Sequence, residues 1–145
     1  MTPAELAQRL RDGALQPDVM SQNCPSRRIL QHVTSRWGTL VLVALEPGTQ
    51  RFSALRRRIG GISERMLAQT LQQLEQDGLV HRHAHDVVPP HVDYTLTPLG
   101  RDLAPRLLSL AIWIEDHLAD LLQPAPIAGP IADGSAVPNA ASDAR

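Results

Sequence analysis

Residues 62–80 of this chain, ISERMLAQTLQQLEQDGLV, carry two stripes of side chains at helical spacing. One stripe is apolar, and the other consists of a guanidinium and three amides: Arg65, Gln69, Gln72 and Gln76. A guanidinium pairs with O6 and N7 of guanine, and an amide pairs with N6 and N7 of adenine. A face that only needs solubility more often carries Glu and Lys, which form i,i+4 ion pairs. The pattern favours a helix that reads base edges; a plain solvated helix is the alternative.

Three consecutive arginines, Arg56, Arg57 and Arg58, lie shortly before this stretch. The helix that precedes a reading helix crosses the DNA backbone, so we expect these guanidinium groups to contact phosphates. Such contacts give affinity and salt dependence without sequence information. The alternative is a solvated basic turn.

Histidines alternate with other residues in the segment HRHAH, residues 81–85. Alternate residues of a strand share one face, and imidazoles grouped in this way can bind zinc. No cysteine or paired carboxylate joins them, so we expect no metal ion and no cofactor. For Arg82 we expect contact with a phosphate or the minor groove.

The single cysteine, Cys24, immediately precedes a predicted helix with Arg27 and Arg28 in its first turn. A thiol at a helix N-terminus beside positive charge is typically reactive, which makes Cys24 a candidate redox sensor. The alternative is a small apolar side chain packed under the first helix. Any disulfide would be intermolecular, because the chain has one cysteine.

The elements that must position these residues are predicted from periodicity, caps and breakers. Ser63 is a good N-cap for the reading helix and Gly78 a good residue for its end. Pro89 and Pro90 stiffen the tip of a hairpin. Helices are expected over residues 3–11, 25–35, 37–45, 52–59, 64–77 and 98–122, and strands over 79–84 and 92–97.

Composition indicates an ordinary globular chain of 145 residues, 43% of them apolar, with a formal net charge of −1. All 14 basic residues are arginine; between Cys24 and Leu118, 11 of them face nine acidic residues, a net charge of +2. No run of about 18 apolar residues and no signal-type leader is present, which predicts a cytoplasmic protein with no membrane partner. The chain contains no Gly-rich phosphate loop, GxSxG or HExxH motif, so we do not expect an enzyme.

Three regions are predicted. Residues 1–20 form an N-terminal extension with a short helix or disorder, and residues 21–122 form one folded domain. Residues 123–145 are rich in Pro, Ala, Gly and Ser and are expected to be disordered.

Six segments occur in an order typical of one family: Asn23-Cys24-Pro25, Arg36-Trp37-Gly38-Thr39-Leu40, Arg51-Phe52-Ser53-Ala54-Leu55, Gly61-Ile62-Ser63-Glu64-Arg65-Met66-Leu67, Leu74-Glu75-Gln76-Asp77-Gly78-Leu79-Val80 and Tyr94-Thr95-Leu96-Thr97-Pro98-Leu99-Gly100. Over residues 22–120 the chain resembles the HxlR-type winged-helix transcriptional regulators, relatives of the MarR group. One departure is Glu64, where many members have proline; its charge lies near the expected phosphates.

The resemblance implies a mainly α fold with a small antiparallel β-hairpin wing, a winged helix-turn-helix. It also implies a homodimer on a pseudo-palindromic double-stranded DNA operator, paired through the first and last helices. Some members sense oxidants through a cysteine at the position of Cys24, and an oxidant or an unidentified small molecule is the expected effector. The residues expected to contact DNA are Ser53, Arg56, Arg57, Arg58, Ser63, Arg65, Met66, Gln69, Thr70, Gln72, Gln73, Arg82 and His91. The alternative function is a winged helix that docks proteins without binding DNA.

Overall fold

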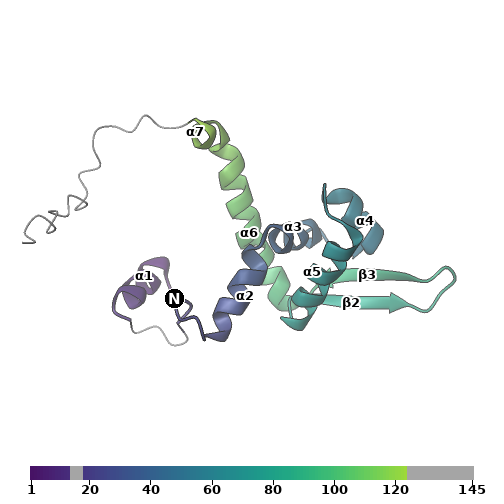
Figure 1. Ribbon diagram of the computed structural model, residues 1–145, viewed down its shortest axis with the longest axis horizontal. Helices are drawn as coiled ribbons and strands as arrows, with labels where there is room; N and C mark the ends of the chain where they lie inside the picture. Colours follow the sequence, from purple (N-terminus) through teal and green to yellow (C-terminus); the bar gives the residue numbers. More distant parts are fainter. Residues whose placement is uncertain (14–17, 124–145) are drawn as a thin grey trace, which may run out of the picture. The chain divides into compact units, whose positions relative to one another are not determined.

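The structure of the protein, a computed structural model, describes residues 1–13 and 18–123 (Figure 1). The tail predicted to be disordered, residues 123–145, lies outside the described residues except for Gln123. The chain divides into two compact units, the first ending at Leu110 and the second beginning at Ala111.

The first unit contains helices and one small sheet. Its elements in chain order are α1 (Pro3–Arg11), α2 (Pro25–Thr34), α3 (Arg36–Leu45), β1 (Gln50–Arg51), α4 (Phe52–Arg58), α5 (Glu64–Gln76), β2 (Val80–His85), β3 (His91–Leu96) and the start of α6 (Pro98–Asp116). Apart from β1, each of these up to β3 was predicted to within one residue at either end. The predicted fold class, mainly helical with a small antiparallel hairpin, is confirmed.

Helix α1 begins with a capping box. The Thr2 hydroxyl accepts a hydrogen bond from the backbone N–H of Glu5, and the Glu5 carboxylate accepts one from the backbone N–H of Thr2. Hydrogen bonds from the Thr2 backbone and then its side chain lower the pKa of Glu5. The predicted N-terminal helix is therefore confirmed with its own start signal.

The predicted caps of α5 are also confirmed. The Ser63 hydroxyl accepts a hydrogen bond from the backbone N–H of Met66 at 3.1 Å. At the other end Gly78 has a φ of 78°, which a side chain would strain. These two residues determine where the helix starts and stops, and thus which of its residues face outward.

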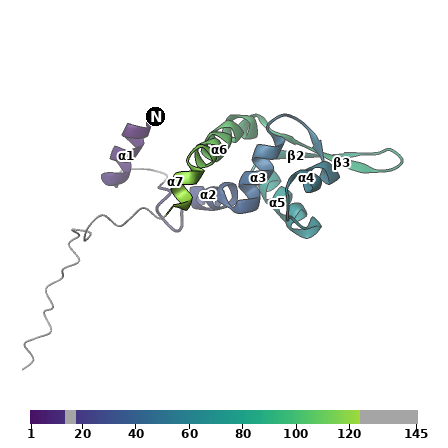
Figure 2. The same cartoon turned by 90° about the horizontal axis from the view of Figure 1, so that it is seen from above.

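The sheet has three antiparallel strands in the order β1-β3-β2. Strand β1 was not predicted; it pairs Gln50 with Tyr94 and Arg51 with Asp93. The other pair runs from Val80 opposite Leu96 to His85 opposite His91. Figures 1 and 2 show β2 and β3 projecting as a hairpin beyond α4 and α5, and we call this hairpin the wing.

One apolar core holds the first unit together. Its largest fully buried side chains come from α3, α4, α5 and β2: Val41, Leu42, Leu45, Leu55, Leu67, Leu71, Leu74 and Val80. Each fully buried leucine contributes about 1.5–3 kcal/mol. The start of α6 approaches this core so closely that a Cβ on Gly100 would lie 2.1 Å from the carbonyl oxygen of Leu79. Only glycine allows that approach.

The prediction of one continuous last helix is wrong in the second unit. The last helix was expected to continue to Leu122, but α6 ends at Asp116 and a separate helix α7 spans Leu118–Leu122. Between them His117 adopts φ −109° and ψ 10°. Its ring nitrogen Nδ1 lies 2.8 Å from the Trp113 carbonyl oxygen and its ring stacks on Trp113 at 4.5 Å. The Trp113 carbonyl oxygen thus contacts both the ring and the backbone N–H of His117 at the point where the helix breaks.

Within the described residues, no helix has the length and apolar character needed to cross a membrane.

Candidate nucleic-acid interface

The polar stripe of α5 is exposed along its length: Arg65, Gln69, Gln72 and Gln76. The opposite side packs into the core through three leucines: Leu67, Leu71 and Leu74. Because the buried side anchors the helix, the exposed side chains project from a rigid support. Met66 borders the stripe with 38% of its surface exposed, and Gln73 is half-buried. This face has the dimensions of one helix and can enter a major groove.

Thr70 does not belong to this face. Its side chain is buried, and its hydroxyl donates a hydrogen bond to the Met66 carbonyl oxygen at 2.7 Å. A threonine that bonds back to the preceding turn satisfies its polar atom inside the helix. The expectation that Thr70 contacts DNA is therefore withdrawn.

Glu64, which stands where many family members have proline, forms an ion pair. Its carboxylate accepts a hydrogen bond from the guanidinium of Arg56 at 2.8 Å, which joins the end of α4 to the first turn of α5. Both side chains are largely exposed, so this ion pair contributes at most about 1 kcal/mol. Arg56 is thus not free to meet a phosphate without releasing Glu64.

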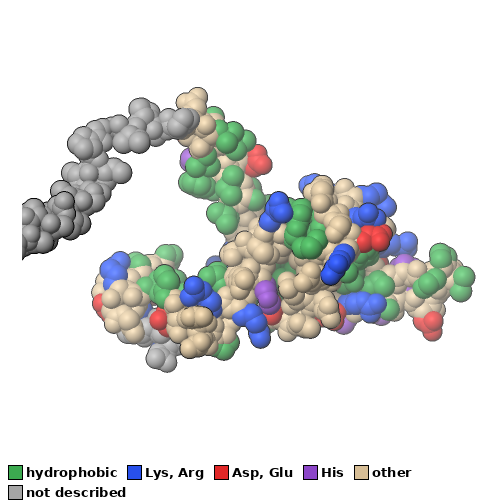
Figure 3. Space-filling model, viewed as in Figure 1, with side chains coloured by type: hydrophobic (Ala, Val, Ile, Leu, Met, Phe, Trp, Pro, Cys, Tyr) green, Lys and Arg blue, Asp and Glu red, His purple; other side chains and the backbone are tan. Residues whose placement is uncertain are grey.

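The other predicted backbone contacts are exposed. Arg57 and Arg58 extend from the last turn of α4, and Ser53 lies in its first turn. Figure 3 shows arginine side chains gathered over α4 and α5. At the start of α5, Ser63 is exposed while its hydroxyl caps the helix. Positive charge therefore surrounds the N-terminal end of α5, where the helix dipole also favours anions.

A groove runs between α5 and the wing. It is lined by Ala68, Leu71, Gln72, Glu75, Arg82 and Tyr94. The groove brings exposed Arg82, on β2, beside the polar stripe of α5, although the two are separated by a turn in the sequence. A wing arginine next to a reading helix can contact the phosphates that flank the bases being read.

His91 lies in a different place from Arg82. It shares a second groove with Ser53, lined also by Arg51, Phe52 and Pro90. The ring of His91 is half-buried and stacks on the ring of His85, with centroids 4.3 Å apart. The expected DNA contact of His91 would therefore have to compete with a contact inside the wing.

Sequence reasoning missed a buried carboxylate that ties α2 to the end of α5. The Asp77 side chain is only 2% exposed; its oxygens lie 2.5 Å from Nδ1 of His32 and 3.9 Å from the guanidinium of Arg28. Asp77 is the C-cap residue of α5. Local sequence gave no signal, because the two partners are 45 residues apart.

Cys24 is the N-cap residue of α2, and its sulfur lies 2.9 Å from the Ser26 hydroxyl. It is half-buried. The two arginines expected beside it point elsewhere, because Arg27 donates to the Met20 carbonyl oxygen and Arg28 faces Asp77. The expected reactivity of the Cys24 thiol is therefore supported by its position at the N-terminus of α2 and not by the two arginines.

Helices α4 and α5, joined by a turn at Gly60 and Gly61 and followed by a two-stranded wing, define a winged helix-turn-helix. The HxlR-like helix-turn-helix family model matches residues 32–121, and the chain belongs to this family.

The relatives agree with this assignment. The chain is 56% identical over 122 residues to the HTH-type transcriptional regulator YtfH of Escherichia coli (strain K12), covering 84% of this chain and 94% of that protein. A solved structure of the transcriptional regulator ytfH from Salmonella typhimurium has 57% identity and a TM-score of 0.70, covering 72% of this chain and 94% of the other. The redox regulator HypR in its reduced form has 36% identity and a TM-score of 0.61, covering 67% and 96%. The chain is thus a helix-turn-helix transcriptional regulator.

Proposed function

We propose that the protein is a sequence-specific DNA-binding regulator that acts as a homodimer on a pseudo-palindromic operator. The observation that carries this proposal is the exposed stripe of Arg65, Gln69 and Gln72 on a helix whose other side is anchored in the core. Arginines of α4 and of the wing flank that stripe. Such an arrangement supplies both base reading and backbone contacts.

The second unit supports the dimer. Its short helical stretch exposes a group of large apolar side chains: Ile112, Trp113, Ile114, Leu118, Leu121 and Leu122. Exposed apolar groups of this size mark interaction surfaces. Pairing with the same surface of a second copy by two-fold symmetry buries them, and a two-fold dimer matches two half-sites one helical turn apart.

The proposal also includes redox or electrophile sensing through Cys24. The redox regulator HypR is a structural neighbour at 36% identity. Cys24 begins α2, and the same helix carries His32, which bonds the C-cap of the reading helix. A bulky adduct on the sulfur would move α2, and the contact with Asp77 would pass that movement to α5.

The test is selection of bound sequences from random duplex DNA by the full chain, with and without diamide. We expect one enriched pseudo-palindrome with half-sites about 10 base pairs apart, centre to centre. A Gln69→Ala and Arg65→Ala double variant should lose the enrichment. Recovery of unrelated sequences by the wild type would contradict base reading.

A protein-docking winged helix is the alternative. It predicts no binding to duplex DNA at low salt, whereas a DNA-binding chain must show affinity that falls linearly with the logarithm of salt concentration. A salt titration with one random duplex separates the two.

A further inference from the structure

One face of the wing collects histidines from both strands. Strand pairing places His83 opposite Asp93 and His85 opposite His91. Residues two apart on a strand share a face, and directly opposed residues share it too. His81 lies two residues before His83 and is on this face as well. Five side chains that bind metals well, four imidazoles and one carboxylate, therefore lie on the same side of the hairpin.

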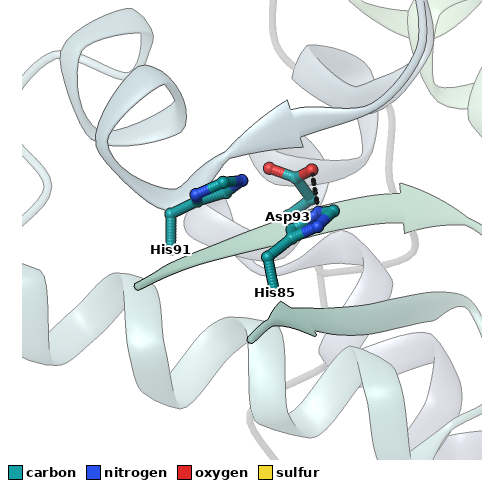
Figure 4. A group of neighbouring side chains, drawn as sticks. All are labelled: His85, His91 and Asp93. Atoms are coloured by element: carbon teal, nitrogen blue, oxygen red, sulfur yellow. Dashed lines mark hydrogen bonds and ion pairs between the residues drawn. The ribbon is translucent and has the colours of Figure 1, made fainter. Parts of the chain in front are cut away.

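Three of these side chains meet. Nε2 of His85 lies 2.6 Å from an Asp93 carboxylate oxygen, and the rings of His85 and His91 stack with centroids 4.3 Å apart. One donor atom from each of His85, His91 and Asp93 lies within 4.8 Å of the other two. Figure 4 shows the carboxylate of Asp93 turned toward the His85 ring, with the His91 ring on the same side.

The three donor atoms are close enough to bind one ion together. Zinc binds imidazole nitrogen and carboxylate oxygen at about 2.0–2.2 Å in a tetrahedron, which places its ligand atoms about 3.4 Å from one another. The donor atoms of His85 and Asp93 are 2.6 Å apart and all three donor atoms lie within 4.8 Å of one another, so small side-chain rotations would suffice to arrange them around one ion. All three side chains are half-buried, and both strands are held by their hydrogen-bonded ladder. The backbone therefore needs no rearrangement.

The identity of the donors selects the class of ion. Two imidazoles and one carboxylate suit zinc and its neighbours among the divalent transition metals, whereas magnesium and calcium prefer oxygen ligands. From the sequence we expected no metal ion because neither a cysteine nor a paired carboxylate joined the histidines of β2. Asp93 supplies that carboxylate from the partner strand, eight residues beyond His85.

We propose that the wing binds one divalent transition-metal ion of the zinc class through His85, His91 and Asp93, with water completing the coordination. The site is separate from the polar stripe of α5 and does not depend on the proposed DNA binding. His83, whose ring meets the edge of the His85 ring at 4.5 Å between centroids, holds that ligand in place.

The experiment is isothermal titration of tag-free full-length protein with zinc chloride in a non-chelating buffer. We expect one zinc ion per chain and no heat of binding with magnesium chloride. His91→Ala should weaken zinc binding at least about tenfold, because even residues that only orient metal ligands cost 10–100-fold when replaced. Asp93→Asn should also weaken it.

His117→Ala serves as the control. It removes a histidine from outside the wing and should bind zinc as the wild type does. The visible absorption of bound Co²⁺ should disappear in His91→Ala. The far-ultraviolet circular dichroism of this variant should stay that of the wild type, because the variant remains folded. Absence of zinc binding, or binding that His91→Ala leaves unchanged, would overturn the proposal. Equal weakening by His117→Ala would do the same.

Discussion

The amide of Gln69 stands at the middle of the exposed stripe on α5. Gln69→Ala should lower affinity for the selected duplex by about 1–3 kcal/mol and leave affinity for an unrelated duplex nearly unchanged. Fluorescence anisotropy at one salt concentration measures both. Gln31→Ala, at an exposed glutamine of α2, is the matched control and should change neither. Equal losses on the two duplexes would remove the base-reading role.

Cys24 allows a clean test of sensing because it is the only cysteine in the chain. Cys24→Ser should bind the selected duplex in reductant as the wild type does, since serine can keep the contact with the Ser26 hydroxyl. Diamide should change binding by the wild type and leave the variant unaffected. Mass spectrometry must first show that Cys24 is modified. A modified wild type that binds DNA unchanged would make Cys24 a packing residue.

For single residues, the sequence predicted which side chains of a helix are exposed, because helical periodicity determines this. The exposure of Arg65 and Gln69 follows from a period of 3.6 residues and from the cap at Ser63. Thr70 was misplaced because a threonine can hide its hydroxyl in the preceding turn. Asp93 and Asp77 were missed because their partners come from other elements, and no local pattern records such pairs.

At the scale of elements, the ion pair between Arg56 and Glu64 joins α4 to α5. Glu64→Gln should raise DNA affinity and make the logarithm of affinity fall more steeply with the logarithm of salt concentration, by about one unit of slope per chain. The reason is that Arg56 becomes free to replace one more counterion on a phosphate. Binding titrations at several salt concentrations measure the slope. Glu46→Gln, an exposed acid at the end of α3, should leave the slope unchanged; an unchanged slope in Glu64→Gln as well would show that Arg56 does not reach DNA.

The contact between α2 and the end of α5 should be worth more than a surface pair, because Asp77 is buried. His32→Ala removes the nearer partner and should lower the free energy of unfolding by about 1–3 kcal/mol. Urea denaturation followed by circular dichroism measures this loss. His81→Ala replaces an exposed histidine and should stay within about 0.5 kcal/mol. A loss in His32→Ala no larger than in the control would contradict a structural role for the contact.

Elements with their own caps and breakers were predictable, and elements that depend on distant partners were not. α5 carries both of its boundaries in the residues Ser63 and Gly78. β1 has two residues and exists because β3 offers an edge to pair with. The break between α6 and α7 at His117, whose ring lies back against Trp113, was not predicted because the apolar periodicity continues through this region.

At the scale of the whole molecule, the exposed apolar group of the second unit carries the proposed dimer. Ile114→Asp should convert the dimer to a monomer, because a charge buried in an apolar interface without a partner is costly. Light scattering after size exclusion at micromolar concentration measures the mass. Val88→Asp changes an apolar residue that is 99% exposed at the tip of the wing and should remain dimeric. A monomeric wild type would contradict the dimer outright.

The buried core of the described chain extends from Val33 to Leu107 and lies wholly in the first unit. Each copy can therefore fold as soon as it is synthesised, before it meets another. With the proposed dimer, pairing becomes a later and separate equilibrium, and while most copies are single the number of pairs grows with the square of their number. Under the proposed function, and while most operators are free, a twofold change in synthesis would change the number of operator-bound pairs about fourfold, which would make the abundance of the regulator a signal in its own right.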